Sequence, residues 1–518
     1  MIPPLLAIAP ATLSKVWVLD AREIKSYQER LLIASAQGLF NRRGLNEGVY
    51  IISDGYDEDW LKELRARKIR VAGRLASTRE LLDKVGVKSA VVFGDAPSHS
   101  GDLATMVAAC EDSLLVADPA LIATYDLNIK KDLRKQFATN VEGYKWVLAN
   151  YGAQLDPKAV SFTVPFVTQT HRPYELRDFQ ISRKMFTFWI SGSDEKDLPG
   201  ADRPAEESYI REVLTTKFDP NIPVYGYPWS GDTFGPGEWD GITILSESSK
   251  FLIPTDNFTN LSLWNRFPPS TKRFPTTKPT MKAKPGARYA AFVMSDGDNA
   301  CTFRNFFFDY WRSGKVDRVP MGWTMAPTLR ELAPPIYDWY VDHLPKGHSV
   351  GSGVSGIGYC SLENYGKGSG RFGEAAYRDF LRMTDESLQR NGFEWSWIMR
   401  YGRFGGKYIK DFLTGVPTAK AVMGGYGNVA RNAGEAIEPM NGRVAFHNWV
   451  DIGNPKEAVG RLQAWMNDPN GPRFTGIFIL NWNYSPDQLK EVAEAGKKLG
   501  ITWVTPVELA HLAQQANP

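Results

Sequence analysis

The stretch Tyr289-Ala-Ala-Phe-Val-Met-Ser-Asp-Gly-Asp-Asn299 joins an apolar run to a cluster of polar residues. The apolar part is typical of a strand buried on both faces, and the polar part begins where that strand should end. Further short apolar runs lie near residues 319–325, 348–354, 394–400, 418–424, 443–448, 474–481 and 501–505. Most of these runs are separated by stretches with helical periodicity, such as 374–390, 456–467 and 486–498. The alternation predicts a (β/α) barrel over residues 287–518, and a distorted barrel with seven good strands would give the same pattern.

The sequence upstream of this region also alternates between strands and helices. Apolar runs at 16–19, 48–53, 90–94 and 113–117 are interleaved with amphipathic stretches, which predicts parallel α/β layering for residues 1–160. Residues 161–266 contain more aromatic and turn residues, and we expect a smaller mixed α/β domain whose loops reach the active site. The segment 267–286 contains five prolines and no acidic residue, which indicates a solvated linker.

The composition is that of an ordinary globular protein. The chain has 518 residues, of which 43% are hydrophobic and 23% are charged, and its net charge is +3. Such a nearly balanced charge argues against nucleic acid as a partner. The three cysteines are far apart in the sequence, so we expect packing residues rather than a disulfide framework or a zinc site. No apolar run is long enough to span a membrane, and residues 1–9 lack the features of a signal peptide.

In barrel enzymes the catalytic groups lie at the carboxyl ends of the strands. Asp296 and Asp298 follow the first strand, and their spacing of two residues would place both side chains on one face of an extended chain. Glu363 follows the third strand after a glycine-rich loop. Because glycoside cleavage uses two carboxyl groups on either side of the scissile bond, we predict Asp296, Asp298 and Glu363 as catalytic residues. Asp296 and Asp298 could instead serve as turn or cap residues, and Glu363 could be an exposed loop acid.

Other polar and aromatic residues follow the same strands and are predicted to bind substrate. Arginine, histidine and asparagine can bind sugar hydroxyls, and aromatic rings offer flat faces to sugar rings. Within strands, however, tryptophan is more often a packing residue, and a lone histidine is often a hydrogen-bonded core residue. The predicted set is Asn299, Trp323, Tyr359, Arg400, Tyr401, His447, Trp449 and Trp482.

Several motifs resemble those of the GxGYxYP family of "putative glycoside hydrolases". Ser295–Asn299 is similar to the barrel motif of that family, and Gly356-Ile-Gly-Tyr359 is similar to the start of its name motif. The N-terminal stretches 37–42, 225–229 and 256–262 also resemble it. After Tyr359 the match departs, because Ser361 and Leu362 stand where the family has Tyr and Pro. The resemblance implies a sugar-processing role and export to the periplasm or cell surface, and a cytoplasmic location also stays open.

The main hypothesis is therefore a glycoside hydrolase that acts on a poly- or oligosaccharide and requires no cofactor. A polysaccharide lyase or a metal-assisted hydrolase is an alternative, the latter with a divalent cation at Asp296 and Asp298. A glycan-binding protein without catalytic activity is the alternative from another functional class. The sequence leaves the sugar, the linkage and the oligomeric state open.

Overall fold

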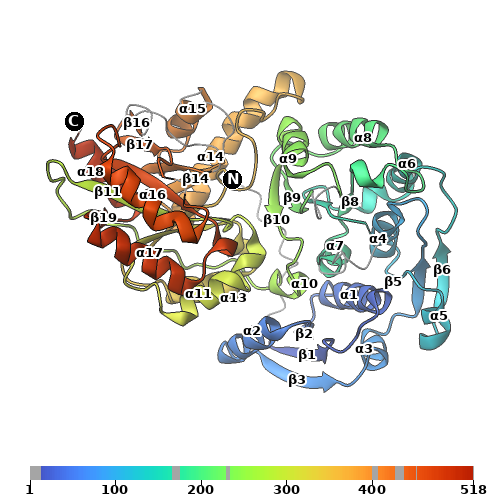
Figure 1. Ribbon diagram of the computed structural model, residues 1–518. Helices are drawn as coiled ribbons and strands as arrows, with labels where there is room; N and C mark the ends of the chain where they lie inside the picture. The colour runs from blue at the N-terminus through green and yellow to red at the C-terminus, as the bar shows by residue number, and fades with distance from the viewer. Residues whose placement is uncertain are drawn as a thin grey trace.

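A computed structural model describes residues 13–165, 176–228, 234–399, 407–425, 437–450 and 452–516. In these residues the strands form four separate sheets, which define four units along the chain (Figure 1). We call them the first, second, third and C-terminal units. The first three lie on one side of the molecule in Figure 1, and the C-terminal unit lies on the other.

The first two units each contain a three-stranded parallel sheet. The first sheet has the order β2-β1-β3, and the second has the order β5-β4-β6. Several of their helices begin at well-defined caps, because Ser26, Ser77 and Thr139 each accept a hydrogen bond from the backbone three residues ahead. The elements of the first unit are β1 (Lys15–Asp20), α1 (Tyr27–Asn41), β2 (Glu47–Ile52), α2 (Gly55–Ala66), β3 (Arg70–Leu75) and α3 (Thr78–Val85). Those of the second are β4 (Ser89–Val92), α4 (Ser100–Cys110), β5 (Leu114–Val116), α5 (Ala120–Tyr125), β6 (Asn128–Asp132), α6 (Asn140–Tyr151) and η1 (Gly152–Gln154).

The third unit contains a four-stranded sheet with the order β10-β9-β7-β8, in which every strand pair is parallel. Its elements are β7 (Val160–Phe162), α7 (Arg177–Arg183), β8 (Phe186–Phe188), η2 (Ser193–Glu195), α8 (Arg203–Thr216), β9 (Pro223–Gly226), α9 (Glu238–Glu247), β10 (Phe251–Pro254) and α10 (Leu261–Trp264). The sequence pattern predicts a smaller mixed α/β domain here, and in the described residues this sheet has the parallel layering that the pattern predicts for residues 1–160.

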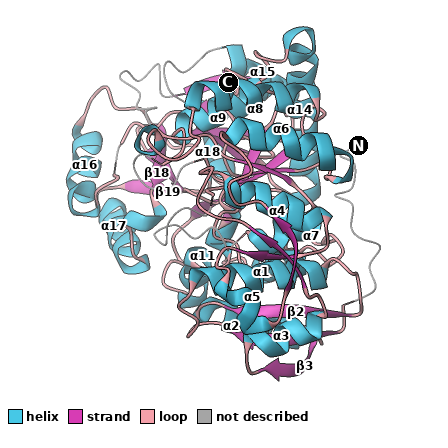
Figure 2. Ribbon diagram, turned by 90° about the vertical axis from the view of Figure 1, so that its right-hand side faces the viewer, coloured by secondary structure: helices cyan, strands magenta, loops and turns pink. Residues whose placement is uncertain are grey.

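The C-terminal unit is built on a curled nine-stranded sheet with the order β16-β17-β15-β14-β13-β12-β11-β18, in which β19 pairs with the start of β11. Its strands are β11 (Arg288–Met294), β12 (Met321–Met325), β13 (Ser349–Ser352), β14 (Trp395–Ile398), β15 (Ala421–Gly424), β16 (Ile437–Met440), β17 (Arg443–Phe446), β18 (Phe474–Ile479) and β19 (Ile501–Trp503). Its helices are η3 (Ala300–Phe303), α11 (Phe306–Ser313), α12 (Leu329–Leu332), α13 (Pro334–Asp342), η4 (Gly370–Phe372), α14 (Gly373–Asn391), α15 (Lys407–Gly415), α16 (Pro455–Asn467), η6 (Asn481–Asn483), α17 (Pro486–Lys498) and α18 (Pro506–Ala516). Figure 2 shows α16 and α17 beside β18 and β19.

Each of the eight apolar runs contains a strand, and the strands pair in parallel except where β16 meets β17. The ends of the curled sheet approach each other at a single parallel bridge between Asn448, just after β17, and Gly476 in β18. No continuous ladder joins β17 to β18 within the described residues. The prediction of an α/β protein with several layered domains is therefore confirmed, whereas the predicted barrel is seen only as a curled sheet and its closure is not confirmed.

The proline-rich segment 267–286 contains no helix or strand, but it does not run freely through solvent. The side chain of Phe274 is only 1% exposed, and the Phe274 N–H donates to the Asn391 carbonyl at 2.9 Å. Further along, the Met281 N–H donates to the Glu508 carboxylate at 2.8 Å. Most residues of the segment are exposed, but an aromatic side chain and side-chain acceptors fix it against the C-terminal unit at these points.

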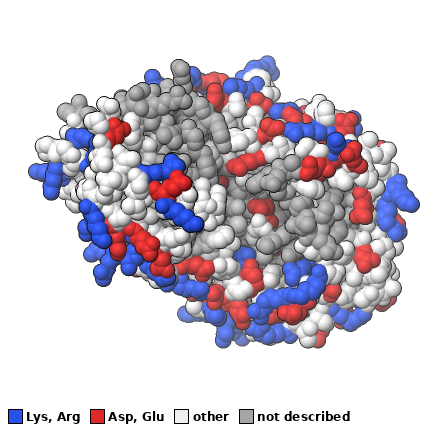
Figure 3. All heavy atoms as spheres, in the orientation of Figure 1, with Lys and Arg blue, Asp and Glu red and all other residues white. Residues whose placement is uncertain are grey.

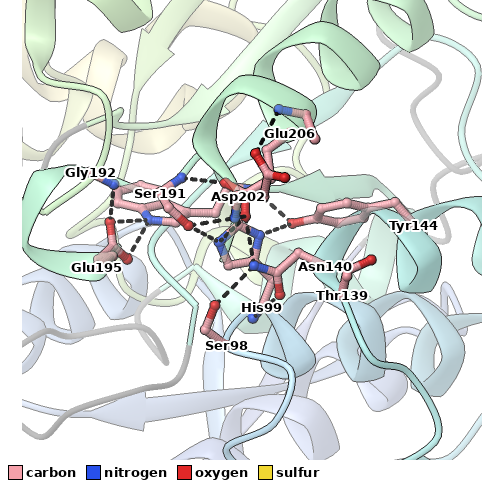
Figure 4. Close-up of polar contacts among 12 residues, drawn as sticks. Ser98, His99, Thr139, Asn140, Tyr144, Ser191, Gly192, Glu195, Asp202 and Glu206 are labelled. Atoms are coloured by element: carbon pink, nitrogen blue, oxygen red, sulfur yellow. Dashed lines mark hydrogen bonds and ion pairs between the residues drawn. The ribbon is translucent and has the colours of Figure 1, made fainter. Parts of the chain in front are cut away.

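A buried polar network joins the second unit to the third (Figure 4). The His99 ring lies between Tyr144 Oη at 3.0 Å and Ser191 Oγ at 3.1 Å. Glu206 accepts hydrogen bonds from the Ser191 N–H at 2.7 Å and from Asn140 Nδ2, also at 2.7 Å. Burial lowers the pKa of His99 to about 4, so the ring is neutral at physiological pH. Because its members are buried and well partnered, this network holds the two units in a fixed arrangement.

Candidate active site

The loop after β11, residues 295–299, carries the predicted acids and is held tightly against the neighbouring strand. Asp296 adopts a left-handed backbone with φ of 63°, and Ser295 Oγ donates to Asp296 Oδ2 at 2.7 Å. The Gly297 N–H donates to Thr324 Oγ1 at 2.9 Å. A Cβ atom on Gly297 would lie 1.6 Å from the Thr324 carbonyl oxygen, so only glycine fits there. Asn299 caps η3 by accepting from the Cys301 N–H at 3.1 Å.

Asp298 lies deeper than Asp296. Its exposed fraction is 8%, and its Oδ1 atom has no hydrogen-bond partner among the described residues. The backbone of the loop after β13 covers it, because a Cβ atom on Gly353 would lie only 2.7 Å from the Asp298 Cα atom. An unpaired buried carboxyl oxygen is costly in free energy, so such a position favours a functional role.

A third carboxyl group comes from the third unit. Glu238 is the first residue of α9, and the Tyr359 hydroxyl donates to Glu238 Oε1 at 2.6 Å. Tyr359 reaches Glu238 because its backbone forms an antiparallel bridge with Leu252 of β10. A Cβ atom on Gly358 would lie 2.9 Å from the Leu252 carbonyl oxygen, so the glycine permits this close approach. The Gly-x-Gly-Tyr motif therefore joins the C-terminal unit to the third unit at the site.

Sequence reasoning missed Glu238. It predicted that loops of residues 161–266 reach the active site, but it assigned no acid from them. Gly235 and Gly237, just before Glu238, both have positive φ. This Gly-Pro-Gly turn before an acid at a helix start was the one local signal available.

The negative charge of Glu238 acts on both aspartates. Burial raises the pKa of Asp296 to about 7, the hydrogen bond from Ser295 opposes this effect, and the negative charge of Glu238 adds to it. The pKa of Asp298 lies well above its ordinary value because of burial first, and then because of the charges of Asp296 and Glu238. At neutral pH this pair of aspartates therefore retains protons that it can donate. Tyr227 lines the same region, since Glu238, Asp298, Asp256 and Asp296 all raise its pKa in addition to burial.

Some of the other predicted site residues lie in the core and some lie at the surface. Others lie outside the residues that the structure describes. Trp323 is fully buried and donates its indole N–H to His348 Nδ1 at 2.9 Å, so the prediction that it binds substrate is wrong. His447 is 5% exposed and Trp449 is half-buried, both next to the bridge between β17 and β18. Trp482 is 58% exposed after β18 and is free to present its ring. Arg400 and Tyr401 lie outside the described residues.

Glu363 is more exposed than either aspartate. Its side chain is exposed, and it lines a hollow of about 250 Å³ together with Trp239, Leu362 and Tyr408, among others. The charges that act on Asp298 come from Asp296 and Glu238. The structure therefore brings Asp296, Asp298 and Glu238 together and places Glu363 in a neighbouring hollow.

The described residues contain no group of three or more His, Cys, Asp or Glu side chains arranged to hold a metal ion. None of the described helices is long and apolar enough to cross a membrane. Figure 3 shows acidic and basic side chains interspersed over the face in view, without a continuous basic field.

Comparisons with solved structures identify the fold. A "putative hydrolase from Bacteroides thetaiotaomicron VPI-5482" is 18% identical over 97% of this chain and 95% of its own, with a TM-score of 0.80. The peptidoglycan deacetylase PdaC from Bacillus subtilis (15% identity, 45% of this chain, 96% of that chain) has a TM-score of only 0.26. A "putative polysaccharide deacetylase from Mycobacterium smegmatis" (13% identity, 47% of this chain, 96% of that chain) has a TM-score of only 0.30. The first structure shares the fold over almost the whole chain, and the other two are too different to support an argument. A search of curated proteins finds no match.

Family models cover nearly the whole sequence in consecutive order. The "GxGYxYP_N 1st domain" matches residues 15–86, and the "GxGYxYP_N second domain" matches residues 87–155. The "GxGYxYP third domain" matches residues 163–266, and the "GxGYxYP putative glycoside hydrolase C-terminal domain" matches residues 286–514. These four matches show that the chain belongs to the GxGYxYP family.

Proposed function

We propose that this protein is a glycoside hydrolase in which Asp296, Asp298 and Glu238 carry out the reaction. The observation that carries the proposal is a cluster of three carboxyl groups, two of which have strongly raised pKa values. Glycoside cleavage requires one carboxyl group that donates a proton to the leaving oxygen and a second, ionised group that attacks or activates water. Carboxyl groups alone suffice for this chemistry, so no cofactor is required.

In this proposal the aspartate pair donates the proton, and Asp298 is the donor because it lies deeper and because burial and the charges of Asp296 and Glu238 hold its pKa well above the ordinary value. Glu238 is the ionised partner. The hydrogen bond from Tyr359 fixes the direction of the Glu238 carboxylate, and the position of Glu238 on another unit allows it to approach the sugar from another side. This assignment replaces Glu363 with Glu238 as the second carboxylate.

We also propose that the curled sheet acts as a barrel whose mouth carries the site. The bridge between Asn448 and Gly476 supports this view, as does the hydrogen bond from the Trp449 N–H to Thr475 Oγ1 at 3.0 Å. Trp482, exposed after β18, would then form part of the rim that holds a poly- or oligosaccharide. We infer from the family resemblance that the protein binds this substrate outside the cytoplasm.

The proposal is tested by incubating the protein with a broad panel of oligosaccharides and aryl glycosides and measuring new reducing ends. On a substrate that is turned over, Asp298→Asn and Glu238→Gln should each lower kcat by about a hundredfold or more, because each removes a proton donor or a charge at the reacting bond. Asp240→Asn is the matched control, since Asp240 is an exposed acid on the same helix as Glu238 and pairs with Arg203. Equal activity of Asp298→Asn and the control would contradict the proposal. A product with new ultraviolet absorbance would instead indicate a lyase.

A further inference from the structure

The hollow beside the acid cluster is formed by segments that meet only in the folded chain. Trp239 comes from α9, Ser361–Asn364 come from the loop after β13, Met399 follows β14, and Tyr408 lies in α15. Its volume of about 250 Å³ is many times the ~10–15 Å³ that one water molecule needs. It is smaller than the pockets of roughly 300–1,000 Å³ that hold whole drug-sized ligands. The size is therefore suited to a single ring rather than to a long segment of chain.

The hollow adjoins the acid cluster through two aromatic residues. Trp239 directly follows Glu238 in the sequence, and its ring meets the Tyr359 ring edge-on at a centroid distance of 6.4 Å. Tyr359 in turn donates its hydroxyl hydrogen to Glu238. A ligand that occupies the hollow is thus in a position to extend to the catalytic carboxyl groups.

The lining combines apolar walls with oriented polar groups. Asn364 is fixed at both ends, since its Nδ2 donates to Ser361 Oγ at 3.1 Å and its Oδ1 accepts from Lys367 Nζ, also at 3.1 Å. Ser361 accepts from Asn364 through its hydroxyl oxygen and can donate its own hydroxyl hydrogen. Glu363 is exposed, and its carboxylate has no hydrogen bond or ion pair to any other residue that the structure describes. Such a free carboxylate can accept from two adjacent hydroxyl groups.

We propose that this hollow is a subsite that binds one neutral sugar ring of the substrate, next to the ring that is cleaved. Trp239 and Tyr408 provide aromatic surface for the ring, and Glu363 and Ser361 bind its hydroxyl groups. The carboxylate of Glu363 disfavours acidic sugars through like-charge repulsion. The inference rests on the proposed function, and it assigns Glu363 to substrate binding rather than to catalysis.

The subsite is tested by comparing kcat/KM for neutral trisaccharides with kcat/KM for aryl monoglycosides of the same sugar. The trisaccharides are cellotriose, laminaritriose, maltotriose and mannotriose. In Glu363→Gln and in Tyr408→Ala we expect the ratio of kcat/KM for the trisaccharide to kcat/KM for the monoglycoside to fall about tenfold. The main cause should be a higher KM for the trisaccharide. Glu374→Gln is the matched control, because Glu374 is an exposed acid on α14 that pairs with Arg378. This control should keep the wild-type ratio.

The outcomes separate the subsite from the proposed function. If the wild type cleaves the trisaccharides and both subsite variants keep the wild-type ratio, the subsite is refuted while the hydrolase proposal stands. If no sugar is cleaved, the same trisaccharides are titrated calorimetrically. Binding that Glu363→Gln weakens about tenfold, and Glu374→Gln does not, then supports the subsite although the hydrolase proposal fails. If the wild type neither cleaves nor binds them, both are contradicted.

Discussion

Single residues determine the shape of the acid loop after β11. Gly297 lies against the Thr324 carbonyl, where any side chain would collide, and Asp296 next to it adopts a left-handed backbone. Asp296 and Asp298 were predictable from the sequence because they directly follow an apolar strand, where acids are costly without a function. Their pKa values were not predictable, because these depend on burial and on the charge of Glu238, which is distant in the sequence.

Substitution of Gly297 tests how strictly the loop is fixed. In Gly297→Ala the new Cβ atom would lie 1.6 Å from the Thr324 carbonyl oxygen, and backbone cannot move aside cheaply. We expect a loss of stability of about 1–3 kcal/mol and a marked loss of activity, measured by urea unfolding and by kcat. Gly55→Ala is the control, because no atom lies within 4 Å of the Cβ position there. If the two variants are equally stable and active, the loop is more adaptable than the structure indicates.

The charge of Glu238 should be visible in the titration of the aspartates. A group with a raised pKa is protonated below that pKa, so the proton donor is lost, and activity falls, as the pH rises through the raised pKa of Asp298. Glu238→Gln removes a negative charge that raises the pKa of both Asp296 and Asp298, so their titration should shift to lower pH. Carbon-13 NMR of the aspartate carboxyl groups measures this shift without requiring activity. An unchanged titration would mean that Glu238 does not act on the pair.

At the scale of elements, hydrophobic pattern predicted most of the buried strands of the first, second and C-terminal units and missed the exposed strands at the sheet edges. β11 and β18 are apolar runs with buried residues at almost every position, and the sequence shows them clearly. β3 reads Arg-Val-Ala-Gly-Arg-Leu and contains no buried residue, and β6 reads Asn-Ile-Lys-Lys-Asp. Both lie at sheet edges, where a strand needs little apolar surface, so their sequences resemble loops.

The His99 network gives a prediction about stability and pH. The folded-state pKa of His99 is about 4, below the ordinary value of 6.5, so between these values the unfolded chain binds more protons than the folded chain. Stability should therefore fall as the pH drops from 6.5 towards 4, by on the order of 3 kcal/mol from this residue. In His99→Gln the decrease in stability that His99 causes over this pH range should be absent. Urea unfolding of both proteins at pH 7 and pH 4.5 measures the difference, and identical pH dependence would exclude His99 as its source.

At the scale of the whole molecule, the site belongs to no single unit. Glu238 and Tyr359 are 121 residues apart in the sequence, and only the docking of the Gly-x-Gly-Tyr loop on β10 brings them together. The residues that follow the strands of the C-terminal unit include Asp296 and Asp298. They do not include a carboxyl group that another unit supplies, such as that of Glu238. The prediction from strand ends placed Glu363 at the catalytic centre, because sequence order does not show which loop faces the acids.

A second junction joins the first unit to the loop that carries the acids. Arg304, at the end of η3, is 4% exposed and donates to Asp54 Oδ1 at 2.9 Å and to Asp57 Oδ1 at 3.2 Å. Asp57 is fully buried, and it also accepts from Thr259 Oγ1 of the third unit at 2.7 Å. Three units thus meet at one buried carboxylate.

Removal of Arg304 should uncouple the three units in a pH-dependent way. Arg304→Met leaves Asp57 buried without its counter-ion, and we expect a loss of about 3–5 kcal/mol at neutral pH together with a lower kcat, since the acid loop loses its anchor. Burial already raises the pKa of Asp57 and Arg304 opposes that rise, so in the variant this pKa should rise further. The loss of stability caused by the substitution should therefore be complete at a pH above the pKa of Asp57. It should become smaller as the pH falls through that pKa, because Asp57 then gains a proton.

Arg312→Met is the control, because Arg312 also joins α11 to the first unit through Asp59, but its side chain is 50% exposed and the pair should contribute less than about 1 kcal/mol. Urea unfolding at pH 7.5 and pH 4.5 measures the free energy of unfolding of both variants. If Arg304→Met loses no more stability than Arg312→Met, this junction does not hold the units together.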